Sequence, residues 1–304
     1  MQYAEAREAF FAVPADGRPA PRIPDSPGRR LRDAAEPLAT ISFWAPEVND
    51  RFAALGLDFL TGYVWARSAP MGEPSAPVVA AAFGVFEPAL VGDLYEQARR
   101  TASRADVLAA REQGAAEGLR AVLDGVDDAE VAGAVAALRR ATDRAAQDVA
   151  GRPLFAGLVS LPWPADPFAQ LWHAASLLRE YRGDVHQAAN VAAGLSAVEM
   201  NLVTELWVGW EPRAYTATRG WSPEAMTGAE EALQRRGLLA GDRLTADGRA
   251  LRDEVERRTD AAVEPLLAEI GPDLDRLTLQ LDRWAGQVVA GGAAPPDPYK
   301  RISG

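Results

Sequence analysis

Residues 196–262 carry the densest run of helix-start and helix-stop signals in this chain, and they constrain its fold more than any other stretch. Ser196 and Glu199 have the spacing of a capping box, which predicts the start of a helix. The apolar residues of that helix recur at every fourth position, on one face: Val198, Leu202, Leu206 and Trp210. Ser222-Pro223-Glu224 then supplies an N-cap, a proline at the first helical position and a first-turn carboxylate, so another helix is expected from there to Gly237.

A short hairpin and a long helix complete this unit. Leu238-Leu239 and Arg243-Leu244 flank three turn residues, which predicts a very short two-stranded wing. Thr245 is expected to cap a helix that ends at Pro265. The passage LTADGRALRDEVERRTD (244–260) resembles MarR-type regulators, in which a Leu-Thr-x-x-Gly turn precedes a long helix. The resemblance implies a winged-helix fold for this part of the chain.

The full length is similar to an actinobacterial family described as helix-turn-helix-like. The similarity includes ARSAPMG (66–72), YRGDVH (181–186) and RGW (219–221). Abundant Ala, Gly and Pro, with arginine in place of lysine, also favour a GC-rich actinobacterial genome. The expected fold class is therefore mainly α, winged-helix-like, with very little β structure.

Pro/Gly-rich stretches divide the remaining chain into helical parts. An N-terminal helical half, a central connecting segment with its helix, and the C-terminal winged-helix half are expected at 29–150, 151–192 and 193–290. Residues 1–28 and 291–304 are expected to be irregular or disordered.

An internal duplication is one interpretation of this organisation. Residues 53–83 and 191–233 share an order of features: a small-residue turn, a helix, an aromatic loop with an arginine, and Ser/Pro opening an Ala-rich helix. Arg67, in a loop expected at 62–74, corresponds in this order to Arg219. Two tandem winged-helix-like halves, a pseudo-dimer joined by central helices, would explain it, and so would coincidence in an Ala-rich chain.

Composition excludes several kinds of chemistry. The chain has no cysteine, so it has no disulfide, thiolate nucleophile or cysteine-ligated metal. Its one lysine, Lys300, lies in a Gly/Pro-rich tail, which disfavours a Schiff base or a phosphate-binding lysine. No long uncharged apolar window is present, so a cytoplasmic protein with no membrane partner is expected.

The charge balance argues against DNA as a partner. Affinity for duplex DNA comes first from cations that neutralise phosphates, and this chain has a formal net charge of −11. The helix expected at 222–237 has three glutamates, and its two arginines lie at its far end. In MarR-type regulators the wing carries an arginine that enters the minor groove, and here only Arg243 could serve. Loss of DNA binding is the favoured interpretation; a MarR-like, ligand-responsive DNA-binding regulator is the alternative.

The segment 181–186 has the densest group of functional side chains. His186 is the candidate proton-transfer group, with Asp184 as the carboxylate that orients it. Alternatively, Arg182 and Asp184 cap helix ends and His186 packs in the core. The spacing of His186 from His173 fits no metal-binding motif, so neither a metal nor another cofactor is expected.

Eight tryptophans, most of them on or beside irregular segments, suggest an aromatic-lined cavity, although core filling is the default explanation. The expected ligand contacts are Arg67, Trp65, His173, Tyr181, Arg182, Arg219 and Trp221. The predicted function is binding of a small aromatic or anionic ligand. Cofactor-independent acid/base catalysis on that ligand, of lyase or cyclase type and in secondary metabolism, is a further hypothesis. Monomer and homodimer remain equally open.

Overall fold

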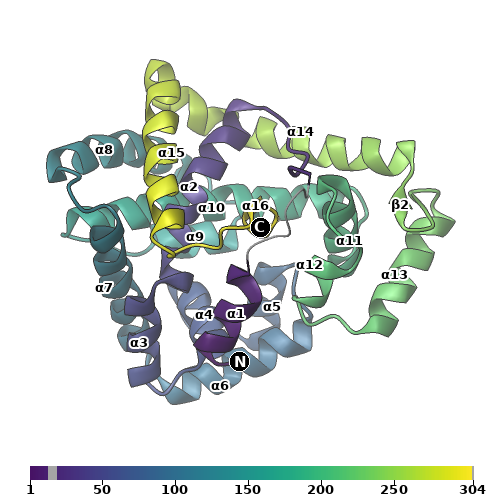
Figure 1. Cartoon of the computed structure of the whole chain (residues 1–304), viewed down its shortest axis with the longest axis horizontal. Coiled ribbons are helices and arrows are strands. Elements are labelled where there is room, and N and C mark those ends of the chain that lie inside the picture. Colours follow the sequence, from purple (N-terminus) through teal and green to yellow (C-terminus); the bar gives the residue numbers. More distant parts are fainter. Residues whose placement is uncertain (13–18, 303–304) are drawn as a thin grey trace.

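The computed structural model describes residues 1–12 and 19–302, and nearly all of its secondary-structure elements are helices (Figure 1). The helices of the first half are α1 (Tyr3–Phe11), α2 (Pro27–Trp44), α3 (Pro46–Ala54), α4 (Phe59–Ser68), α5 (Ala76–Phe83), α6 (Pro88–Thr101), α7 (Arg104–Val122) and α8 (Asp128–Ala145). Those of the second half are α9 (Pro153–Val159), α10 (Pro167–Ala192), α11 (Ala197–Val208), α12 (Ala214–Ala217), α13 (Pro223–Arg235), α14 (Ala246–Ile270), α15 (Leu274–Ala290) and α16 (Pro298–Ile302). Two 3-10 turns, η1 (Ala69–Met71) and η2 (Gly271–Asp273), and two strands, β1 (Leu239–Ala240) and β2 (Arg243–Leu244), complete the described part.

Helix α10 is the central helix of a large helical body. Asp166 caps its start by accepting from the backbone N–H groups of Phe168 and Ala169, and Pro167 occupies its first turn. Helices α2, α7, α8, α9 and α14 all pack on it, and α15 packs on α2 (Figure 1). Because α10 is surrounded on most sides, polar side chains on it must either pair with neighbouring groups or face a cavity.

The local signals at 196–262 correctly predict the architecture of the C-terminal unit, which we call the winged-helix unit. Ser196 and Glu199 form the capping box of α11, and Ser222 and Thr245 cap α13 and α14. Strands β1 and β2 pair antiparallel as the wing. The unit has its own apolar core, made by Leu195, Met200, Leu202, Val203, Ala229, Leu233, Leu238 and Leu239. In Figure 1 it lies at one end of the molecule, and α14 runs from it to the body.

The apolar cores divide the chain differently from the expected boundaries. The far half of α14 and helix α15 contribute to the main core of the body, for example through Val263, Leu267 and Leu281. The C-terminal half expected at 193–290 is thus shared between two cores. Because β1 and β2 are the only strands among the described residues, the N-terminal part has no wing there to match that of the winged-helix unit.

Several predicted irregular segments are ordered. The loop expected at 62–74 begins as helix α4, whose capping box is formed by Asp58 and Thr61. Helix α14 continues through Pro265 to Ile270. The expectation of irregular or disordered ends is wrong for α1 and α16, which lie together: Lys300 Nζ donates to the carbonyls of Ala9 and Phe10. Residues 13–18 and 303–304, part of the same expectation, lie outside the described residues.

No single helix of the described ranges is long and apolar enough to cross a membrane. Helices α10 and α11 pass that test only as a pair, and they are bent by 104° relative to each other.

Candidate functional site

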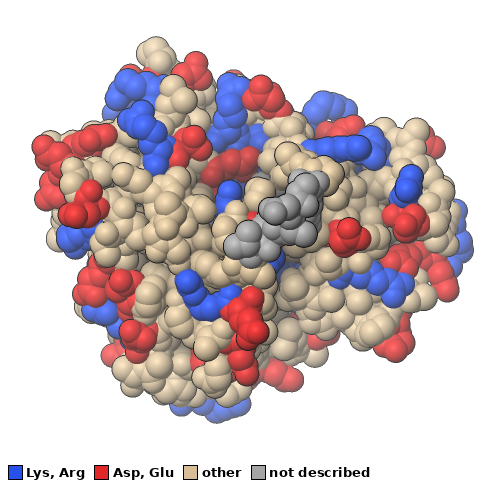
Figure 2. All heavy atoms as spheres, viewed as in Figure 1, with Lys and Arg blue, Asp and Glu red and all other residues tan. Residues whose placement is uncertain are grey.

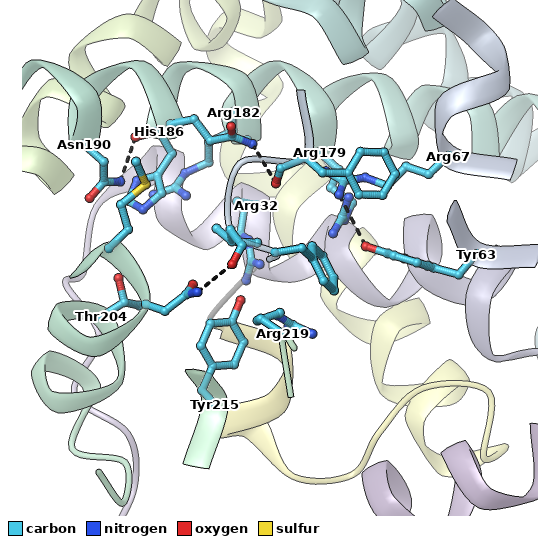
Figure 3. A pocket seen from close by; sticks show the side chains of 17 residues that line it. Arg32, Tyr63, Arg67, Arg179, Arg182, His186, Asn190, Thr204, Tyr215 and Arg219 are labelled. Carbon is cyan, nitrogen blue, oxygen red and sulfur yellow. Dashed lines mark hydrogen bonds between the residues drawn. The ribbon is translucent and has the colours of Figure 1, made fainter. Parts of the chain in front are cut away.

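A cavity of about 80 Å³ lies where the winged-helix unit meets the body (Figure 3). Side chains from α2, α4, α10 and α11 surround it, together with the α5–α6 loop and the segment around α12. Its lining combines charged and polar groups with apolar rings: Arg32, Tyr63, Arg67, Phe83, Val85, Phe86, Arg179, Arg182, Gly183, His186, Gln187, Asn190, Met200, Asn201, Thr204, Tyr215 and Arg219. It is thus enclosed by residues that are far apart in the sequence.

Helix α10 presents a polar stripe to this cavity. Arg179, Arg182, His186 and Asn190 follow at helical spacings of three and four, so they share one face of the helix. Gly183 lies within this stripe, and a Cβ atom built there would meet only Glu180 Oε2, at 3.8 Å. The missing side chain therefore leaves open space in front of the helix.

The α5–α6 loop joins the body to the winged-helix unit at the edge of the cavity. The carbonyl of Val85 accepts from Asn201 Nδ2 at 2.6 Å and from Trp221 Nε1 at 3.0 Å. The backbone N–H of Glu87 donates to the carbonyl of Arg219 at 2.9 Å. These three bonds fix the position of Arg219 relative to the body.

Most arginines of the lining are held by buried carboxylates. Arg67 donates to Glu180 through Nε and Nη2, at 3.0 and 2.9 Å, and Arg179 donates to the same carboxylate. Burial by itself would raise the pKa of Glu180, but the two guanidinium groups outweigh it and lower that pKa to about 2. Arg32 similarly has Asp33 and Glu36 as partners. These arginines shape the cavity wall, and their charges are largely compensated.

Arg182 is paired with carboxylates but is only partly hydrogen-bonded. Its Nη2 donates to Glu256, while its Nε has no hydrogen-bond partner although the atom is buried. Burial lowers the pKa of Arg182 to about 10, because Glu256 offsets the desolvation only in part and neighbouring arginines repel the charge. Arg182 thus has Glu256 and, at 3.8 Å, Asp260 as counter-charges, and its Nε is the atom left without a hydrogen bond.

Arg219 differs from the other four arginines of the lining because no described carboxylate lies within 4 Å of it. Its guanidinium carbon lies 4.2 Å from the ring centre of Tyr215 and 4.9 Å from that of Phe86. Its Nε is buried without a partner. Stacking on aromatic rings fixes the plane of a guanidinium and leaves its N–H edge available to a carboxylate.

His186 contacts α14 through one ring nitrogen. Its Nδ1 lies 3.0 Å from the hydroxyl of Thr259, which in turn donates to the carbonyl of Val255 at 2.8 Å. Burial and the charges of Arg252 and Arg182 hold the pKa of His186 well below its ordinary value. The imidazole is therefore neutral near pH 7.

The structure brings four of the predicted site residues together. Arg67, Arg182, His186 and Arg219 all line the cavity. Trp221 lies at its edge through its bond to the Val85 carbonyl.

The other predicted contacts lie elsewhere. Asp184 accepts from the backbone N–H of Phe155 at 3.0 Å, so it caps α9 and does not orient His186. Trp65 is completely buried and donates to the Ala102 carbonyl. His173 packs edge-on against Trp163. Tyr181 donates to the carbonyl of Ala262 and lines a different hollow, between α8 and α14.

Several lining residues were not predicted, among them Arg32, Tyr63, Arg179, Asn190, Asn201 and Tyr215. For Arg179 and Asn190, the signal in the sequence is the polar stripe of α10, a helix that is otherwise largely apolar; the other four lie on other helices. Arg179, Arg182, His186 and Asn190 occupy positions i, i+3, i+7 and i+11. The pattern places these side chains on one face only because α10 continues through Gly183.

The fold and the cavity define a mainly α-helical protein in which a helix-turn-helix unit with a short wing closes over a polar pocket of a larger helical body. The model of a helix-turn-helix family matches residues 28–295, so the chain belongs to that family. Comparison with curated proteins finds no match, and comparison with solved structures finds none either.

Proposed function

We propose that this protein binds a small anionic organic ligand in the cavity between its body and its winged-helix unit. Arg219 carries the proposal, because it is a half-buried cation held between two rings without a carboxylate partner. The Nε of Arg219 is buried without a hydrogen bond, and buried polar atoms in proteins are nearly always bonded, so a partner from outside the chain is indicated. A carboxylate could accept two parallel bonds from its exposed edge.

The apolar lining indicates the rest of the ligand. Phe83, Phe86 and Met200 supply apolar surface beside the arginines. The cavity volume of about 80 Å³ is several times the roughly 10–15 Å³ that a cavity needs to hold one water, so there is room for a compact organic molecule. An aromatic or compact aliphatic carboxylate fits these limits.

Binding is better supported than acid/base catalysis. A general base works best when its pKa lies near the working pH, and the pKa of His186 lies well below that range. The carboxylate expected to orient it, Asp184, caps α9 instead. We therefore assign His186 to ligand contact.

The winged-helix unit supports the proposal that DNA is not the partner. On α13 and the wing, Arg235 lies 3.9 Å from Glu231, and Arg243 lies 3.8 Å from Asp242. Arg213, before α12, pairs with Glu230. Figure 2 shows acidic and basic side chains interspersed over this end of the molecule. A phosphate backbone would meet neighbouring carboxylates along with these cations.

A calorimetric titration of the full chain with a panel of small aromatic and aliphatic carboxylates tests the proposed function. We expect Arg219→Gln to weaken binding by about 10- to 100-fold, since a charge-assisted hydrogen bond contributes roughly 1.5–3 kcal/mol. Arg243→Gln, a matched change on the exposed wing, should leave affinity unchanged. If no acid in the panel binds the wild-type protein, or if Arg219→Gln binds as tightly as wild type, the proposal is wrong.

A further inference from the structure

We infer that the ligand carries a neutral hydrogen-bond donor, a hydroxyl group, in addition to its anionic group; this rests on the proposed function. The inference comes from two hydrogen-bond acceptors on α10, Asn190 Oδ1 and His186 Nε2. Neither has a partner among the described residues.

The hydrogen bonds of His186 determine which ring nitrogen carries the proton. A threonine hydroxyl has one proton, and Thr259 donates it to the carbonyl of Val255. The same hydroxyl must therefore accept from His186, so Nδ1 carries the proton of the neutral ring. Nε2 is then an acceptor, and no described residue donates to it.

The orientation of the Asn190 amide is determined in the same way. Its nitrogen donates to the carbonyl of His186 at 2.8 Å, a position that only the NH₂ group can occupy. Oδ1 is therefore the other amide atom, and it is buried without a partner in a side chain that is 1% exposed. Buried acceptors in proteins are nearly always satisfied, so this atom marks a contact with a donor.

The donors and acceptors of the cavity are arranged along α10. Arg182, with its unpartnered Nε, lies four residues before His186 and eight before Asn190. At 1.5 Å per residue, the arginine end and the amide end are about 12 Å apart along the helix axis. A bound molecule that satisfies both ends presents negative charge to Arg182 and Arg219 and a donor to the other end.

The charge of the surroundings selects the kind of donor. A second carboxylate would bring negative charge against two acceptors. An ammonium group would enter a cavity lined by five arginines, among which Arg219 has no carboxylate partner. A hydroxyl group avoids both conflicts, and the rings of Tyr215 and Phe86 would accommodate an aromatic hydroxy acid.

Matched aromatic acids test this inference. We would titrate the full chain with benzoate, with 3- and 4-hydroxybenzoate, and with the corresponding methoxybenzoates, which keep the oxygen but cannot donate. At least one hydroxybenzoate should bind 10-fold or more tightly than benzoate and than its own methyl ether. Asn190→Leu and His186→Phe should each reduce this advantage, whereas Arg243→Gln, on the exposed wing, should leave it unchanged.

The outcomes separate the two proposals. If benzoate and the hydroxybenzoates bind wild type equally, or if both variants keep the full advantage, the inferred donor is wrong and the proposed function stands. If none of these acids, nor any acid in the wider panel, binds wild type, the proposed function fails and the inference fails with it. The comparison of acids on wild type decides the question even where a variant does not fold.

Discussion

Arg67 of α4 and Glu180 of α10 are joined by two nearly parallel hydrogen bonds of 3.0 and 2.9 Å, and both side chains are more than nine-tenths buried. Arg67 was predicted as a contact to an anionic ligand. Because the N–H edge of Arg67 already donates to Glu180, Arg67 connects α4 to α10 beside the cavity. Arg219, by contrast, has no carboxylate partner among the described residues.

Removing Glu180 should destabilise the protein strongly. In Glu180→Gln, the buried cations Arg67 and Arg179 lose their shared carboxylate, which should cost about 3–5 kcal/mol of unfolding free energy. The control, Glu231→Gln, breaks an exposed pair and should cost at most about 1 kcal/mol. Urea unfolding at pH 7 measures both; equal values for the two variants would contradict the prediction.

The stability that the pair of Arg67 and Glu180 contributes should depend on pH. The pKa of Glu180 is lowered to about 2 in the folded protein, so its ionised form stabilises the fold at pH values above its ordinary pKa. That contribution should decline as the pH falls from about 4.5 toward 2. The difference in stability between wild type and Glu180→Gln should shrink over this interval.

Local chemistry explains which parts of the fold could be predicted. The caps of α11, α13 and α14 lie within a few residues of the helices they start, so a short window of sequence contains the whole signal. The part of α4 beyond Gly62 was missed because two glycines and two prolines in residues 62–74 suggest a loop. A Cβ atom at Gly62 would lie 2.6 Å from Phe52 Cδ2, so this glycine permits close helix packing, a reason that only tertiary structure reveals.

The same difference between local signals and tertiary contacts applies to the site. In the structure, three of the expected arginines and His186 line one cavity. The pairing of Asp184 with His186 failed because α10 does not break at Gly183. On a continuous helix, residues two apart point about 200° from one another, so these two side chains face opposite sides. The partner of His186 comes instead from Thr259, 73 residues away, which no local pattern identifies.

Asp184 should affect stability and not ligand binding. Burial raises the pKa of Asp184 to about 7, so the folded state holds its proton more tightly than the unfolded state does. Stability from this group should therefore fall as the pH rises from about 4 to 7. Asp184→Asn should remove that loss and be more stable at pH 8 by about 1–4 kcal/mol, at about 1.4 kcal/mol per pKa unit.

Chemical unfolding of Asp184→Asn between pH 4 and pH 8 would measure this change. Calorimetry on the same variant should give wild-type affinity for carboxylates. A folded Asp184→Asn protein without binding would place Asp184 in the ligand site and contradict its assignment as the cap of α9.

Protonation of His173 should lower the free energy of unfolding in acid. It is 2% exposed, and burial together with the charges of Arg111 and Arg139 lowers its pKa to about 4. The unfolded state therefore binds this proton first, and stability should fall by about 3 kcal/mol as the pH drops from 6.5 to 4, at about 1.4 kcal/mol per pKa unit. His173→Phe keeps an aromatic ring against Trp163 and should flatten this part of the curve. An unchanged curve in that variant would assign the acid sensitivity to other groups.

The winged-helix unit should not retain DNA. Its arginines Arg213, Arg235 and Arg243 lie beside carboxylates, so few counterions would be released on binding. A gel-shift titration with genomic fragments at low salt should show no retention at micromolar protein. Retention that weakens steeply with added salt and disappears in Arg243→Gln would instead favour a DNA-binding regulator.

Substitutions at Gly183 should change the stability of the protein and its affinity for carboxylates independently. Glycine inside a helix costs about 1 kcal/mol relative to alanine, and α10 carries it where the cavity needs space. Gly183→Ala should stabilise the protein by about 0.5–1 kcal/mol, since the added Cβ meets only Glu180 Oε2 at 3.8 Å. Gly183→Leu should extend into the cavity and weaken carboxylate binding at least 10-fold in a folded protein.

Gly133 provides the matched control for this prediction. It lies in α8 on an exposed face, and a Cβ atom there would meet nothing within 4 Å. Gly133→Ala should raise the unfolding free energy by the same amount as Gly183→Ala, and Gly133→Leu should leave carboxylate affinity unchanged. Urea unfolding and calorimetry on the four variants test both expectations. If Gly183→Leu folds and binds carboxylates like wild type, the space in front of Gly183 is not where the ligand lies.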